Sequence, residues 1–100
     1  MTFTEIVERE SRLVALKLLA EQPDRRLNSS LMREALADSW AINKPREWLH
    51  FQLRFLAEIG AVQITEAGTV LIATLTDRGL DHVERRIVLD GVKRPSLGAP

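Results

Sequence analysis

The spacing of apolar residues predicts a long helix at the start of the chain. Between about Thr2 and Glu21, the stretch from Leu13 to Ala20 is apolar almost all round, as in a helix enclosed by its neighbours. Thr2 and Glu5 have the spacing of a capping box. Pro23 ends the segment, because the residue before a proline is pushed out of the helical region.

Two shorter helices are predicted next, after a polar link at residues 24–26. The cap-forming residues 28–30 indicate the start of the first of them, which ends near Ser39. Pro45 suits the first turn of the other, where its missing amide hydrogen costs nothing. Gly60 ends that helix, because glycine tolerates a left-handed cap.

The period of the pattern then changes from helical to alternating. Apolar and polar residues alternate over residues 62–65, residues 66–68 form a turn signal, and residues 69–75 are rich in β-branched side chains. This pattern predicts a β-hairpin. Thr76 is a good cap for a last helix that continues to Gly91.

The fold class that follows is mainly α with a small β-hairpin, an α+β domain over residues 1–91. The tail at residues 92–100 contains two prolines and a glycine within its last six residues and is expected to be flexible. We expect one shared core of inward-facing apolar side chains: Leu13, Leu16, Leu36, Leu49, Leu53, Leu56, Val62, Leu75 and Leu80.

Composition narrows the classes of function. The apolar fraction of 45% and the charged fraction of 28% are those of an ordinary globular domain. Fourteen basic residues balance fourteen acidic residues, which excludes a polybasic nucleic-acid coat or membrane binder. The longest charge-free run, residues 67–76, is half of what a membrane span needs, so we expect a cytoplasmic protein.

Catalytic and metal chemistry find little support in the sequence. It contains no cysteine, which excludes disulfides, cysteine zinc sites and thiolate catalysis. His50 and His82 fall on different predicted helices without a second ligand at metal spacing, and the glycines form no phosphate-binding loop. We therefore expect no metal, no cofactor and no enzymatic activity.

Two segments resemble winged helix-turn-helix proteins. Residues 49–62, Leu-His-Phe-Gln-Leu-Arg-Phe-Leu-Ala-Glu-Ile-Gly-Ala-Val, look like the third helix and first wing strand of that family. Residues 75–79, Leu-Thr-Asp-Arg-Gly, are similar to the Leu-Thr-x-x-Gly that closes the wing in many bacterial winged-helix regulators. The whole chain, including residues 91–95, also resembles a small winged-helix protein of Mu-like prophages.

The resemblance implies a winged helix-turn-helix fold over roughly residues 10–90 and a small phage or bacterial transcriptional regulator that binds double-stranded DNA. Winged-helix proteins normally place the third helix in the major groove. At 100° per residue, Arg46, His50 and Arg54 share one stripe of that helix and are candidates for base or phosphate contacts. Arg25 and Arg26 are candidates for phosphate contacts.

Other features favour a winged helix that serves as a protein-interaction or assembly module without DNA. No Lys or Arg occurs between Phe55 and Asp77, the stretch that includes the predicted hairpin. Glu66 at the hairpin turn would repel phosphate. Phe51 occupies a position where DNA readers often carry a polar residue. The apolar excess of Leu13 to Ala20, with Val88 and Leu89, predicts a homodimer through the first helix, the last helix, or both.

Overall fold

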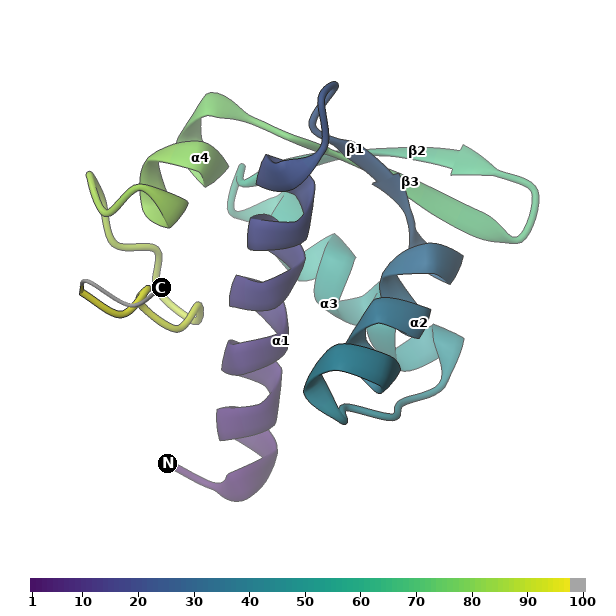
Figure 1. Ribbon diagram of the computed structural model, residues 1–100, viewed down its shortest axis with the longest axis horizontal. Coiled ribbons are helices and arrows are strands. Elements are labelled where there is room, and N and C mark those ends of the chain that lie inside the picture. The colour runs from purple at the N-terminus through teal and green to yellow at the C-terminus, as the bar shows by residue number, and fades with distance from the viewer. Residues whose placement is uncertain (98–100) are drawn as a thin grey trace.

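The computed structural model describes residues 1–97, which form four helices and three strands (Figure 1). In chain order these are α1 (Phe3–Glu21), β1 (Arg26–Asn28), α2 (Ser29–Trp40), α3 (Arg46–Glu58), β2 (Val62–Ala67), β3 (Val70–Leu75) and α4 (Asp77–Val83). The expected α+β class and the first three helices are confirmed.

Helix α1 lies in the middle of the molecule, with α2 on one side and α4 on the other (Figure 1). Its predicted capping box is present, because the Thr2 side chain accepts from the Glu5 N–H while the Glu5 carboxylate accepts from Thr2. The second half of α1 is enclosed by the other elements, and Leu16 and Leu19 are completely buried. The apolar stretch that predicted a homodimer thus belongs largely to the core of one chain.

The strands form an antiparallel sheet in the order β1-β3-β2. β2 and β3 are the predicted hairpin, here called the wing, with Val62 opposite Leu75 and Ala67 opposite Val70. β1 was not predicted, since part of it was assigned to a polar link. Three residues are too few to show alternation, and β1 becomes a strand by pairing with β3, with Leu27 opposite Ala73.

The expected core is confirmed, with one exception. Eight of its nine leucine and valine side chains are buried, while Leu80 is half-buried. Leu53 and Leu56 from α3 are completely buried, so this helix packs its inner face against the rest of the domain.

The sequence had predicted a last helix that continues to Gly91. In the structure, α4 ends at Val83. Arg85 adopts a left-handed conformation with φ of 66°, which turns the chain out of the helix. The turn brings Leu89 and Val92 into the core, where both are almost fully buried. The predicted length of the last helix is therefore wrong.

His82 holds this turn in place and is completely buried. Its Nδ1 accepts from the Leu89 N–H at 3.1 Å. Its Nε2 lies 2.9 Å from the Lys93 carbonyl oxygen and donates to it in the neutral ring. His82 thus satisfies backbone groups and is a structural residue.

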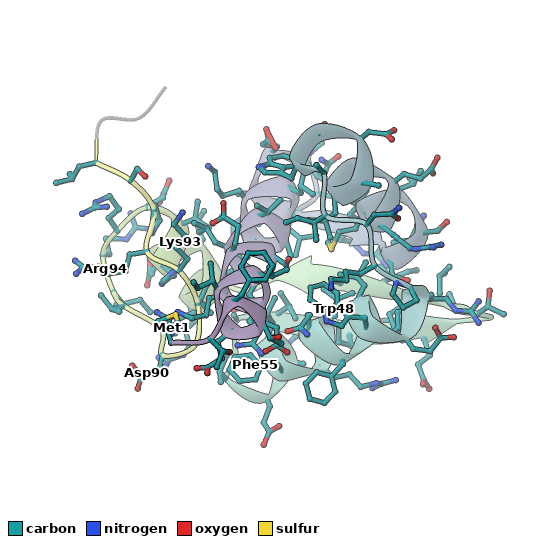
Figure 2. The ribbon with its side chains drawn as sticks, turned by 90° about the horizontal axis from the view of Figure 1, so that it is seen from below. Met1, Trp48, Phe55, Asp90, Lys93 and Arg94 are labelled. Carbon is teal, nitrogen blue, oxygen red and sulfur yellow. The ribbon has the colours of Figure 1, made fainter. Side chains whose placement is uncertain are left out.

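The packed domain continues past Gly91, where the flexible tail was expected to begin. The Lys93 N–H donates to the Arg9 carbonyl at 3.2 Å, and the Lys93 ammonium lies 3.0 Å from Glu10. Figure 2, which looks along α1, shows Lys93 and Arg94 to one side of this helix. Residues 98–100 of the expected tail lie outside the described residues.

Gly79 allows α4 to approach the junction between α3 and β2. A Cβ at this position would lie 2.3 Å from the Ala61 carbonyl oxygen and 2.6 Å from the Leu75 side chain. Such distances are far below van der Waals contact, so glycine is required by space and not by its backbone angles. The Leu-Thr-x-x-Gly segment therefore fixes where α4 starts.

Candidate nucleic-acid interface

Helix α3 presents the predicted stripe of Arg46, His50 and Arg54 on the side away from its buried leucines. The three residues are spaced by four, which places them above one another on one face of a helix. Arg46 and Arg54 are exposed, and His50 is half-buried. The exposure of the two arginines agrees with the outward face expected for α3, whereas His50 is partly enclosed.

His50 connects α3 to the start of α2 and to the wing. Its Nε2 lies 2.9 Å from the hydroxyl oxygen of Ser29, the first residue of α2. The same oxygen accepts from the Leu71 N–H of β3 at 3.0 Å. A single buried hydroxyl thus fixes the relative positions of the three elements that meet at this face.

The surroundings of His50 favour its neutral form. Burial lowers the pKa of His50, and the positive charges of Arg46 and Arg54 lower this pKa further, while Glu47 opposes them. A neutral imidazole leaves the two arginines as the positive charges of the stripe. A phosphate placed beside the two arginines would instead stabilise the charged form of His50.

Each of three candidate arginines has a carboxylate close by. Arg54 lies 3.0 Å from Glu66 of the wing. The other distances are 3.7 Å from Arg46 to Glu47 and 3.1 Å from Arg25 to Asp77. Exposed ion pairs of this kind contribute little to stability, so they reduce the local positive charge without locking the side chains.

Arg25 and Arg26 do not join the stripe of α3. Arg26 lies opposite Thr74 at one end of β3, whereas Glu66, the partner of Arg54, lies opposite Leu71 near the other end. Arg25 is directed to Asp77 at the start of α4. These two arginines therefore lie at the base of the wing, away from the stripe of α3.

A cleft beside the stripe adds residues that the sequence analysis missed. It has a volume of about 380 Å³ and lies between the starts of α2 and α3 and the tip of the wing. Its lining combines hydroxyl groups, two arginines and one glutamate: Ser29, Ser30, Arg33, Pro45, Arg46, Glu47, Thr69 and Val70. Hydroxyl and guanidinium groups are the usual donors to phosphate oxygens.

Arg33 is the most informative of the missed residues. Its Nε donates to the Lys44 carbonyl at 2.8 Å, which orients the guanidinium toward the cleft between α2 and α3. The sequence analysis assigned no role to Arg33. Only the fold brings it next to Arg46 and Thr69, from two other elements.

The aromatic side chains of α3 differ in exposure: two are partly covered and one is exposed. The Phe55 ring is covered by the Arg12 guanidinium at 3.7 Å, and the Trp48 ring lies 5.5 Å from the Lys44 ammonium. Figure 2 shows Trp48 and Phe55 on the side of α3 that faces the rest of the molecule. Phe51 is 63% exposed, as the protein-interaction hypothesis expected.

Residues 1–97 hold no group of three histidine, aspartate or glutamate side chains arranged to bind a metal ion. None of the helices in this part of the chain is both long and apolar enough to cross a bilayer.

Comparison with curated proteins identifies a phage relative. The uncharacterised protein gp26 of Escherichia phage Mu is 33% identical over 91 residues, which cover 91% of this chain and 93% of gp26. The chain belongs to the gp26 family. No protein-family model matches this gp26-family chain.

Solved structures similar to the gp26-family chain are winged-helix proteins. The complex structure of hsRosR-S4 has a TM-score of 0.65 and 18% identity, covering 86% of this chain and 67% of that one. F93 from STIV, a winged-helix DNA-binding protein, has a TM-score of 0.60 and 20% identity, covering 74% of this chain and 79% of F93. The winged helix-turn-helix fold expected from the sequence is confirmed.

Proposed function

We propose that this gp26-family protein binds double-stranded DNA with the outward face of α3 and the adjoining cleft, and acts as a small transcriptional regulator. The observation that carries the proposal is the convergence of Arg33 and Arg46 with several hydroxyl groups in one cleft beside the α3 stripe. The description of F93 as a DNA-binding protein supports it. The proposal includes a cytoplasmic location and no catalytic role.

The proposed division of labour follows from position. Arg46 and Arg54 on α3 contact the major groove, where guanidinium groups recognise guanine edges or phosphates. The hydroxyls and Arg33 of the cleft hold a neighbouring phosphate. Arg25 and Arg26 contact the backbone at the base of the wing.

A titration of labelled mixed-sequence duplex at about 50 mM salt, followed by fluorescence polarisation, tests the proposal, because counterion release helps even non-specific binders at low salt. Arg54→Ala is expected to cost about 1–3 kcal/mol of binding free energy if Arg54 contacts a base. Arg26→Ala is expected to weaken all duplexes alike and to reduce the salt slope by about one.

Arg86→Ala is the matched control for Arg54→Ala. The side chains of Arg54 and Arg86 are 56% and 55% exposed, and both form ion pairs with carboxylates. Arg86 follows α4, which lies across the molecule from the tip of the wing (Figure 1). Equal losses for the two variants would remove Arg54 from the interface, and no affinity of the wild type at low salt would remove DNA binding from consideration.

The alternative function is a winged-helix interaction module without DNA. The exposure of Phe51 and the pairing of Arg54 with Glu66 favour it. In that case Phe51→Ala disturbs binding to a protein partner, and the arginine variants change little.

A further inference from the structure

A buried polar cluster joins α1, α3 and the segment after α4 (residues 84–97). Its centre is Arg12 of α1, which is only 8% exposed. The Arg12 Nε donates to the side-chain oxygen of Gln52 in α3 at 2.8 Å, and its Nη1 donates to the Gly91 carbonyl, also at 2.8 Å. Gln52 is 1% exposed, and its amide nitrogen donates to the Glu8 carboxylate at 3.2 Å. One guanidinium thus connects three separate parts of the chain.

The flat side of this guanidinium is also enclosed. Arg12 lies over the ring of Phe55, another residue of α3, at 3.7 Å from the ring centre. A Cβ at Gly91 would lie 2.6 Å from the Phe55 ring and 3.3 Å from Arg12 Nη1, so the backbone approaches both groups as closely as glycine permits. Figure 2 shows Phe55 on the side of α3 that is nearest to the segment after α4. The guanidinium is therefore restrained in direction as well as in position.

Burying this charge costs free energy that apolar packing would not. Burial lowers the pKa of Arg12, and the attraction of Glu8 offsets this effect only in part. Well-packed apolar side chains can often replace a buried polar cluster without loss of stability. Apolar contacts have no preferred direction, however, whereas the hydrogen bonds of a planar guanidinium do. The property that the cluster adds is therefore a defined orientation of the elements that it joins.

The cluster meets α3 on the side opposite to the outward stripe. Gln52 is two positions from both His50 and Arg54, which corresponds to about 200° around the helix. On the outer side, the His50 ring lies 2.9 Å from the Ser29 hydroxyl. Hydrogen bonds thus hold α3 on two opposite sides. Loss of the inner bond leaves the helix free to turn about the outer one.

We propose that Arg12 and Gln52 are positioning residues of the candidate interface: their hydrogen bond sets the rotation of α3 about its own axis, and with it the direction of the stripe. The segment after α4 takes part, because the Gly91 carbonyl holds the other end of the guanidinium. The consequence for DNA binding rests on the proposed function, whereas the orientation of α3 is a property of the free protein.

The double variant Arg12→Met/Gln52→Leu tests the proposal, because it replaces the centre of the cluster with apolar groups. Residual dipolar couplings of the backbone amides, measured by NMR without DNA, report the orientation of α3 relative to α1. We expect α3 to turn by roughly 15°, a typical variation among packed helices, while the urea midpoint changes little. Duplex affinity at about 50 mM salt is expected to fall about tenfold, as for residues that act on a site without touching it.

Arg12→Lys is the second variant, and it keeps the charge. A lysine ammonium lacks the planar fork that holds Gln52 and Gly91 together, so a turn of α3 and a loss of affinity are expected here too. This conservative change keeps the test decisive if the double variant does not fold. Arg86→Met is the matched control, since it removes one positive charge at a side chain that is 55% exposed. It is expected to leave the orientation of α3 unchanged.

Unchanged dipolar couplings of α3 in a folded cluster variant overturn the proposal, and so does an equal turn in Arg86→Met. If the wild type binds duplex DNA, a turn of α3 without loss of affinity overturns it as well. If the wild type does not bind, the proposed function fails, and the dipolar couplings still decide whether the cluster orients α3.

Discussion

His50 gives folding stability a defined pH dependence. Burial and the two neighbouring arginines hold its pKa below the value of about 6.5 found in unfolded chains. As pH falls through this value, the unfolded state takes up more protons than the folded state, so the free energy of unfolding decreases. Urea unfolding between about pH 7 and pH 5 is expected to show this loss, and His50→Gln is expected to reduce it. Equal pH profiles for the two proteins would contradict the assignment.

We expect His50 to give the proposed DNA binding a pH dependence opposite to that of folding stability. A phosphate beside the α3 stripe stabilises the charged imidazole, so binding is coupled to proton uptake by His50. Duplex affinity is expected to rise as pH falls from about 8 to 6, when measured by polarisation at constant salt. His50→Gln is expected to flatten this profile, and an equally steep profile in that variant would assign the proton to another group.

Glu66 is expected to weaken non-specific binding at the proposed interface. Its carboxylate lies 3.0 Å from Arg54 and faces the same approaching phosphates. Glu66→Gln is expected to strengthen binding to mixed duplex about two- to fivefold at low salt, the range of an exposed ion pair. Glu84→Gln removes a similar pair with Arg86 at 2.6 Å and serves as the control in the same titration. Equal effects of the two variants would show that only total charge matters.

At the scale of elements, the register of α3 is open to a direct test. Leu53 is completely buried, whereas Phe51, two residues earlier, is 63% exposed. Leu53→Ala is expected to lower the free energy of unfolding by about 2–5 kcal/mol, through lost burial and a cavity. Phe51→Ala is expected to change it by less than about 0.5 kcal/mol. Denaturant unfolding distinguishes these values, and the reverse order would mean that the helix is rotated.

Elements with a long, repeated pattern could be predicted from the sequence, and the others could not. α1, α3 and the wing each repeat their apolar spacing over several turns or strand pairs, so their type was evident. β1 has only three residues and exists because β3 pairs with it. The end of α4 depends on the burial of His82, Leu89 and Val92, which are separated along the chain and meet only in the fold.

In the candidate site, too, residues that share one helix could be predicted from the sequence, and residues that meet only in the fold could not. A helical wheel was sufficient to find Arg46, His50 and Arg54, because they share one element. Arg33 and Thr69 were missed because their proximity depends on how α2 and the wing pack. The ion pair of Arg54 with Glu66 was missed for the same reason, although the repulsive effect of Glu66 on phosphate was anticipated.

At the scale of the whole molecule, the segment after α4 closes the domain. Val92 is completely buried, whereas Val88 is 57% exposed. Val92→Ala is expected to lower the free energy of unfolding by about 1–3 kcal/mol, since it removes buried methyl groups. Val88→Ala is the control and is expected to have little effect in the same thermal or urea unfolding experiment. A flexible tail starting at residue 92 would make the two variants equivalent.

Gly79 separates the requirements of the fold from those of binding. The glycine is required by the approach of α4 to the Ala61 carbonyl, a contact that lies at the base of the wing and involves no arginine of α3. A side chain at this position is therefore expected to displace α4 and to leave the outward stripe of α3 in place. The Leu-Thr-x-x-Gly segment accordingly reports how the chain packs and carries no information about what the protein binds.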